Sequence, residues 1–224
     1  MHTFFSMKEV VGAEHHELRG SVTDTIGTIA SAVGKDKFLP YMDKSFHLAL
    51  EGLKMDSSRL RESAFIFFAV MADVLKAELI PVLPQIMPSL IETLNQEDLD
   101  FTGDKITEEE ARRLLNGNDE EDLDSDDDDD ESLEMNVNSA LQLEKEIAAD
   151  SLGEIFINVK GGFLPYLQTA TEQLLVLADT YYDGARKSAL SALWHFVVTL
   201  GELQITEDWQ PGLPLVTFPV HGRD

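Results

Sequence analysis

A recurring two-helix plan constrains the fold more than any other feature of this chain. The pair Leu18-Arg19 returns as Leu60-Arg61, 42 residues further on, and each pair opens a stretch with apolar residues at helical spacing. A third stretch of the same kind contains Ile147, and a fourth begins at Ala185. Such spacing is typical of arrays of helix pairs, in which each unit buries its apolar face only against its neighbours. The sequence therefore predicts an all-α solenoid.

Turn residues and charge divide the chain into four blocks. Residues 1–95 and 138–203 carry the helical periodicity, and residues 96–137 form an acidic insertion between the second and third units. Residues 204–224 are rich in turn residues. We expect the insertion to be mostly disordered, because its like charges repel and it has little apolar surface to bury. A short helix is predicted within it over 108–116.

Proline marks the turn between the two helices of a unit, because its missing N–H is harmless in the first turn of a helix. Phe38-Leu39-Pro40-Tyr41 opens the second helix of the first unit, and Phe163-Leu164-Pro165-Tyr166 opens that of the third. Val82-Leu83-Pro84-Gln85 is the stretch that we match to them in the second unit. Ser139 and Gln142 form a capping box, which predicts the start of the third unit there.

The insertion contains a dense run of acid, with eleven carboxylates in thirteen residues. These residues are Asp119, Glu120, Glu121, Asp122, Asp124, Asp126, Asp127, Asp128, Asp129, Asp130 and Glu131. Such a run cannot bury itself, so it must lie in water or against something basic. Because it interrupts a helical array, a type of scaffold that commonly grips proteins, a basic protein partner is favoured. A solvated loop with no partner is the alternative.

The overall charge and composition exclude several classes of function. The chain carries 42 acidic and 17 basic residues, a net charge of −25, so phosphates are repelled and no direct nucleic-acid binding is expected. It has no cysteine, which excludes a disulfide framework and thiolate chemistry. No apolar stretch approaches the roughly 20 residues of a membrane span, and no signal peptide is expected. We therefore expect a cytoplasmic or nuclear protein that does not contact the membrane.

No group of residues suggests catalysis. The adjacent pair His15-His16 faces two ways on a helix, which is poor geometry for one metal ion. His195 follows Trp194 on a mainly apolar helix, where we expect a structural histidine and a tryptophan packed between neighbouring helices. The run Asp124–Asp130 lacks the glycine and the glutamate of a calcium loop. We expect no enzyme activity, no cofactor and no specific metal site.

The aromatic residues suggest one core cluster and one exposed contact. Phe65, Phe67 and Phe68 stand at helical spacing, which predicts core packing rather than a ligand site. Trp209 lies in the turn-rich block and is the better candidate for an exposed contact, because exposed tryptophan is unusual.

The helix pairs, with an arginine near the start of the first helix and Phe-Leu-Pro-Tyr opening the second, resemble the HEAT repeats of the importin-beta (karyopherin-beta) family of nuclear import receptors. The sharpest match is to the beta-4 type of this family. It consists of the acidic insertion followed by Val137–Lys145, Ala148–Ile155 and Phe163–Leu167, and Trp209-Gln210-Pro211-Gly212 continues it. The resemblance implies a HEAT-repeat α-solenoid with an acidic loop. Since such receptors are several times longer, the chain is expected to be a central fragment.

The resemblance also implies partners. These are basic cargo proteins such as histones and ribosomal proteins, the GTPase Ran, and nucleoporins, met while shuttling between cytoplasm and nucleus. Second helices usually line the concave side of such arrays. Asp43, Glu51 and Glu92 fall on predicted second helices, so we expect them to bind cargo together with the acidic run. The run either captures cargo or mimics cargo and occupies the scaffold's own basic residues.

Two other classes of function stay open. A non-transport HEAT-repeat scaffold, as in phosphatase scaffolds, would not need acid of this density. An acidic histone-chaperone-like binding protein would carry its acid as a terminal tail on a compact or dimeric fold, whereas this run is internal. A hydrolase built on helical repeats has no residue set to support it.

Overall fold

The computed structural model describes residues 15–97 and 129–205, with side chains described from 138 to 204 in the second stretch. Every regular element in these residues is helical, and no strand occurs among them. In chain order the elements are α2 (His16–Val33), α3 (Lys35–Phe38), η3 (Leu39–Tyr41), α4 (Met42–Gly52), α5 (Ser58–Leu75), η4 (Lys76–Val82), α6 (Leu83–Asn95), α8 (Asp129–Val159), η5 (Lys160–Tyr166), α9 (Leu167–Leu177) and α10 (Asp183–Ile205). The all-α prediction is confirmed.

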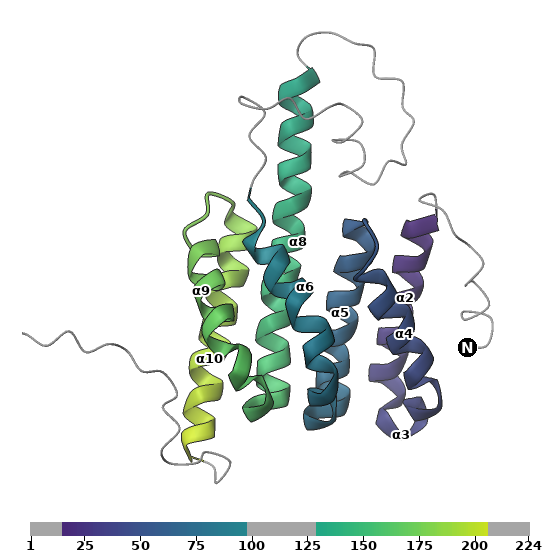
Figure 1. Ribbon diagram of the computed structural model, residues 1–224. Helices are drawn as coiled ribbons and strands as arrows, with labels where there is room; N and C mark the ends of the chain where they lie inside the picture. Colours follow the sequence, from purple (N-terminus) through teal and green to yellow (C-terminus); the bar gives the residue numbers. More distant parts are fainter. Residues whose placement is uncertain (1–14, 98–128, 206–224) are drawn as a thin grey trace, which may run out of the picture.

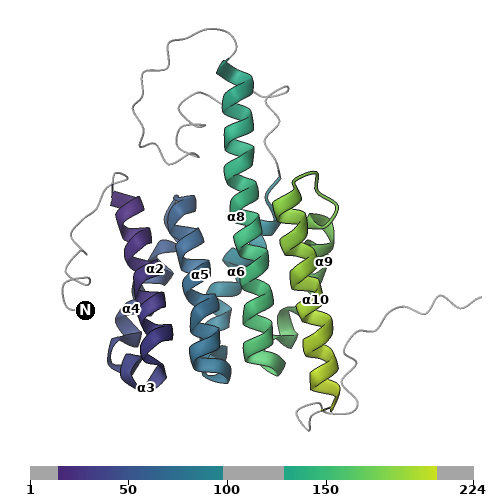
Figure 2. The ribbon, with the colours of Figure 1, turned by 180° about the vertical axis from the view of Figure 1, so that it is seen from behind.

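The helices form two layers (Figures 1 and 2). The first helices of the units, α2, α5, α8 and α10, stand side by side in one layer, and the second helices α4, α6 and α9 form the other. Helix α5 packs on both α2 and α8, and α8 packs in turn on α10. This stacking of helix pairs is a HEAT-type α-solenoid, as the repeat predicts.

Each first helix of the three helix pairs stops at a residue with positive φ. These residues are Gly34 (φ 77°), Lys76 (φ 52°) and Lys160 (φ 47°). Glycine adopts such a conformation freely, whereas lysine does so at a cost. Gly34 caps the end of α2, and its N–H donates to the carbonyl oxygen of Ala30 at 3.0 Å. At the other end of a first helix, the Oγ of Ser57 caps α5 by accepting from the N–H of Leu60.

A buried anchor residue followed by a proline shapes the turn between the two helices of a unit. The pairs of anchor and proline are Phe38 and Pro40, Leu79 and Pro81, and Phe163 and Pro165. Each anchor is at most 1% exposed. The predicted match at Val82-Leu83-Pro84-Gln85 is wrong, because Pro84 lies in the first turn of α6 while Pro81 occupies the 3-10 turn. Burial of the anchor, which local sequence does not show, sets the register.

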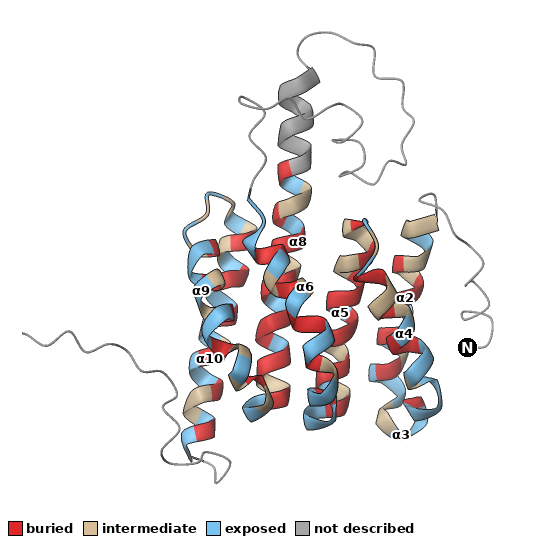
Figure 3. Ribbon diagram, in the orientation of Figure 1, coloured by how far each residue is buried: buried red, intermediate tan, exposed pale blue. Residues whose placement is uncertain are grey.

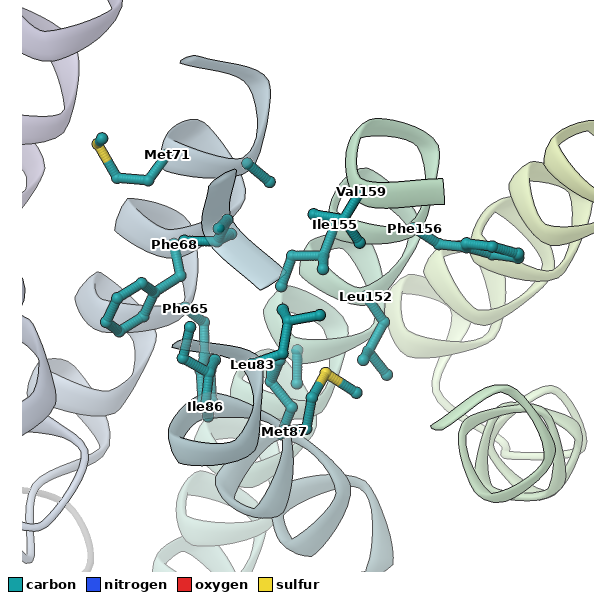
Figure 4. Close-up of a cluster of buried hydrophobic side chains, with 14 of the residues drawn as sticks. Phe65, Phe68, Met71, Leu83, Ile86, Met87, Leu152, Ile155, Phe156 and Val159 are labelled. Atoms are coloured by element: carbon teal, nitrogen blue, oxygen red, sulfur yellow. The ribbon is translucent and has the colours of Figure 1, made fainter. Parts of the chain in front are cut away.

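The core lies between the two layers. Phe65, Phe67 and Phe68 are at most 1% exposed, so the core prediction is confirmed. Figure 4 shows the apolar side chains of α5, α6 and α8 meeting in one cluster, with Leu83 between the other two helices. The ring of Phe46 on α4 packs edge-on against both Phe67 and Phe68, with centroids 5.7 and 5.5 Å apart. Each such side chain contributes roughly 1.5–3 kcal/mol by leaving water.

Helix α8 begins earlier than the sequence predicts. It starts at Asp129 rather than near Ser139, so Ser139 lies inside the helix and is not its cap. Consequently Asp129, Asp130 and Glu131 belong to a helix and not to a disordered loop. Carboxylates in the first turn are favoured by the positive end of the helix dipole. The predicted helix over 108–116 and the residues from 206 onwards lie outside the described part of the chain.

Trp194 does not pack between helices as predicted, since it is 66% exposed. Helix α10 packs on α8 through its opposite side, which carries Ala189, Ala192 and Phe196. Both buried and exposed residues occur along α10 in Figure 3. His195 is half-buried and lies against Gly153 of α8, as expected of a structural histidine. None of the described helices combines the length and hydropathy needed to cross a bilayer.

Candidate cargo-binding face

The predicted contact residues of the scaffold all stand on the layer of second helices. Asp43 and Glu51 belong to α4, and Glu92 belongs to α6. Asp43 and Glu92 are exposed, and the side chain of Glu51 is 40% exposed. All three carboxylates are therefore accessible to a partner that binds this layer.

A groove of about 440 Å³ lies between α4 on one side and η4 and α6 on the other, and Asp43 and Glu51 line it. Its lining comprises Met42, Asp43, Phe46, His47, Leu50, Glu51, Lys54, Leu75, Glu78, Val82 and Gln85. The lining thus combines apolar side chains, mostly from α4, with three carboxylates and one lysine. Such a surface suits a lysine or arginine side chain, whose aliphatic stem packs on apolar groups while its charged end reaches a carboxylate.

The chain already neutralises part of this charge. Glu51 lies 4.0 Å from Nη2 of Arg19, and Nδ1 of His47 lies 3.2 Å from its other carboxylate oxygen, a contact that is an ion pair only when the imidazole is protonated. Glu78 is paired with Lys35. Of the three carboxylates that line this groove, Asp43 is the one without an ion pair in the described part of the chain.

A second groove, of about 270 Å³, contains the remaining predicted carboxylate. Glu92 and Asp56 line it together with Lys54, Arg61 and neighbouring polar residues. Lys54 also lines the first groove, so the two grooves adjoin along the end of α4. The structure thus places Asp43 and Glu51 in one groove and Glu92 in the next.

Sequence reasoning missed two carboxylates on this face, Glu78 and Asp56. Both lie in connections between helices rather than on predicted second helices: Glu78 lies in η4, and Asp56 precedes the cap of α5. The available signal was their position close to Pro81 and Ser57, where the chain passes from one layer of helices to the other.

A buried ion pair supports the second groove. Arg61 donates to Glu144 of α8 from Nε at 2.6 Å and from Nη2 at 2.9 Å, and Thr93 of α6 donates to the same carboxylate at 3.2 Å. Burial alone would lower the pKa of Arg61, but the hydrogen bonds and the charge of Glu144 raise it above its ordinary value. Burial also raises the pKa of Glu62, and repulsion from Glu144 adds to that effect. The sequence marked Arg61 only as a repeat position and gave no sign of its partner.

The acidic run is only partly described. Asp119, Glu120, Glu121, Asp122, Asp124, Asp126, Asp127 and Asp128 lie outside the described residues. Asp129, Asp130 and Glu131 occupy the first turn of α8, and their side chains are not described. Their position relative to the two grooves therefore stays a prediction. Within the described residues, no group of three or more His, Asp or Glu side chains lies close enough together to hold a metal ion.

Comparison with known proteins supplies the family context. No family model matches the sequence. The chain is 46% identical over 208 residues to a Schizosaccharomyces pombe protein named "Probable importin subunit beta-4". The match covers 90% of this chain and 19% of the relative, so the chain spans about a fifth of the length of that protein.

Proposed function

Because the chain belongs by sequence to the importin-beta family, we propose that it serves nuclear import by binding basic cargo proteins on its layer of second helices. The two adjoining grooves, lined by apolar side chains and by carboxylates from α4, η4 and α6, carry this proposal. Histones and ribosomal proteins are the cargo class that the acidic surface fits. Engagement of Ran and nucleoporins, and shuttling between cytoplasm and nucleus, are part of the same proposal.

Binding in the grooves would combine two contributions. The stem of a cargo lysine packs on Phe46 and Leu50, and its ammonium group approaches Asp43. Each such exposed ion pair adds only about 0.2–1 kcal/mol, so affinity has to come from several contacts acting together. The net charge of −25 attracts a basic chain from a distance and raises its association rate, an effect that salt weakens.

The acidic run acts in this proposal by capturing cargo rather than by shielding the scaffold. Shielding requires basic residues on the scaffold that are available to the run. Many of these residues already have a carboxylate partner in the described structure. They are Lys35 with Glu78, Arg59 with Glu17 and Asp24, Arg61 with Glu144, Lys76 with Asp73, Lys160 with Glu202, and Arg186 with Asp183. These pairs leave the scaffold little positive charge to shield.

A lysine-rich histone-tail peptide, labelled for fluorescence anisotropy, tests the function. The full chain should bind it at low salt and lose affinity steeply as salt rises, since exposed charges are screened over about 8 Å at physiological ionic strength. The double variant Asp43→Asn/Glu92→Gln should weaken binding by roughly 2- to 30-fold. Replacing Asp126–Asp130 with serine should weaken it mainly through the association rate.

The matched control is Asp73→Asn, which removes one exposed carboxylate from α5 in the other layer and should leave affinity unchanged. If Asp73→Asn lowers the affinity for the peptide as much as the groove variant does, the loss comes from the net charge of the chain and not from the grooves. Binding that does not respond to salt would contradict cargo capture. If the serine variant instead binds acidic probes more tightly and basic peptides equally well, the run shields the scaffold.

A further inference from the structure

The lining of the second groove is balanced in charge. Lys54 and Arg61 supply its two cations, and Asp56 and Glu92 supply its two carboxylates. A balanced lining gives a cargo lysine little net attraction, because the attraction to each carboxylate is offset by the repulsion from a cation. The groove selects a cargo cation only if another group neutralises one of its own two cations.

The group that neutralises Arg61 is Glu144, which does not line the groove. Nε and Nη2 of Arg61 donate to the two Glu144 oxygens at 2.6 and 2.9 Å, and Nη1 donates to the carbonyl oxygen of Met55 at 3.4 Å. The Glu144 side chain is 2% exposed, so cargo does not touch it, whereas the Arg61 side chain is 20% exposed. Every nitrogen of the guanidinium group therefore has an acceptor, and the two carboxylates of the groove form no ion pair among the described residues.

The first unit shows what an arginine at the same repeat position does without such a partner. Arg19 stands 42 residues before Arg61 in the repeat. Its Nη2 lies 4.0 Å from Glu51, which is a carboxylate of the first groove. Arg19 pairs with no other carboxylate in the described part of the chain. The arginine of the repeat thus reaches a carboxylate of the cargo-binding face when no buried carboxylate holds it.

We propose that Glu144 is a positioning residue that makes the second groove selective for cations, because it holds Arg61 and leaves Asp56 and Glu92 to the cargo. This inference rests on the proposed function, since it concerns how that groove chooses its ligand. Burial lowers the pKa of Arg61, while Glu144 raises it most and the charges of Asp56 and then Glu62 raise it further. Asp56 is therefore the carboxylate to which Arg61 turns when Glu144 is removed.

The lysine-rich histone-tail peptide and the full chain test the inference by fluorescence anisotropy. Glu144→Gln removes the charge and one of the two acceptor oxygens. It should weaken binding by about 1.5- to 5-fold, because Arg61 then takes one carboxylate away from the cargo. Asp73→Asn is the control of equal charge, since it also removes one negative charge and should leave the affinity unchanged. Arg61→Met/Glu144→Leu removes the cation together with its partner, so it should recover most of the affinity that Glu144→Gln loses.

Asp56→Asn separates positioning from a purely structural role. In the wild type it should weaken binding by about 1.5- to 5-fold, because one ion pair with the cargo is lost. In Glu144→Gln it should cost nothing further, because Arg61 already occupies that carboxylate. In Arg61→Met/Glu144→Leu it should again cost as much as in the wild type. If Glu144 only holds the two units together, the losses from Asp56→Asn and Glu144→Gln should simply add.

A crystal structure of Glu144→Gln tests the rearrangement without cargo, and Arg61 should lie within about 4 Å of Asp56. Arg61 paired with Glu62 instead, additive losses, or a Glu144→Gln variant that binds as the wild type does would overturn the inference while cargo binding stands. If Glu144→Gln does not fold, Arg61→Met/Glu144→Leu decides. Tighter binding by that double variant than by the wild type would show that Arg61 repels cargo despite Glu144, which would also overturn the inference. A wild-type chain that binds no peptide would overturn the proposed function and the inference with it.

Discussion

Arg61 of α5 holds Glu144 of α8 through two hydrogen bonds, and the two residues lie on opposite sides of the acidic insertion. The Glu144 side chain is only 2% exposed, and Thr93 of α6 donates to it as well. Three helices from two units therefore meet at one carboxylate. The pair fixes how the third unit docks on the second, although the sequence between the two units is long and acidic.

Breaking this pair should destabilise the protein strongly. Arg61→Met leaves the Glu144 carboxylate buried without its cation, which should lower the free energy of unfolding by about 3–5 kcal/mol. The double variant Arg61→Met/Glu144→Leu should recover most of that loss, because no buried charge remains. Urea unfolding followed by circular dichroism measures both. If Arg61→Met and the wild type are equally stable, water reaches Glu144 and the ion pair does not hold the third unit on the second.

Glu62 should make stability depend on pH. Burial raises its pKa in the folded state, and repulsion from Glu144 adds to this, so the ionised form is disfavoured by folding. The cost is fully present at pH values above the folded pKa and disappears below the unfolded value of about 4.3. Glu62→Gln should thus stabilise the chain by roughly 0.5 kcal/mol at pH 7, since the side chain is only partly buried.

The gain from Glu62→Gln should shrink as the pH falls from 7 toward 5, which stays above the isoelectric point near 4.4. Urea midpoints of the variant and the wild type at both pH values give the comparison. A gain that is constant with pH would assign the effect to packing of the amide and not to the charge.

The left-handed lysines should be replaceable by glycine. Lys76 has φ 52° and ψ −128°, and glycine adopts such angles without the steric cost that lysine bears. Lys76→Gly loses exposed contacts to Asp73 and Asn158, which are worth little. We expect a net gain of about 0.5–1 kcal/mol.

Thermal unfolding measures that gain, and Lys76→Ala is the control. Alanine loses the same two contacts and keeps the unfavourable backbone, so it should destabilise the chain. If alanine and glycine behave alike at position 76, backbone conformation does not limit stability there.

Two glycines on first helices should respond differently to the same substitution. A Cβ at Gly153 would lie 2.8 Å from Nδ1 of His195 and 3.2 Å from the backbone of Ala192, so Gly153→Ala should cost about 1–3 kcal/mol. A Cβ at Gly27 would lie 3.6 Å from the ring of Phe67, an ordinary contact. Gly27→Ala should be neutral or stabilise by up to about 1 kcal/mol, because alanine favours the helix. Denaturant midpoints of the two variants check both, and equal midpoints would contradict the close approach of α8 and α10.

Helical periodicity was enough to predict the helix pairs, because apolar residues spaced three and four apart must share one covered face. Helix α5 (Ser58–Leu75), for example, buries Phe65, Phe67 and Phe68, which their helical spacing predicted to be core residues. The start of α8 at Asp129 was not predicted, because repulsion among carboxylates competes with their favourable placement at a helix N-terminus. That balance depends on the rest of the helix, which packs on α5 and α10.

Sequence patterns could not predict features that depend on a contact with a residue far away in the sequence. Trp194 was expected to be packed because it is large and apolar, yet whether a neighbour covers it depends on which side of α10 meets α8. The placement of Asp43 and Glu92 on second helices followed from periodicity. The carboxylate of Glu78 joined their face only through the turn that Pro81 and its buried anchor form.

The early start of α8 sets a minimum length for any cargo segment that touches both acidic regions. The helix rises above its neighbours in Figure 1, and about 13 Å of helix separates Asp129 from Asn138, its first described buried side chain. An extended peptide covers at most about 3.6 Å per residue, so about four residues are needed merely to climb that height. We predict that a cargo segment which reaches both acidic regions carries two basic clusters separated by a spacer of at least that length.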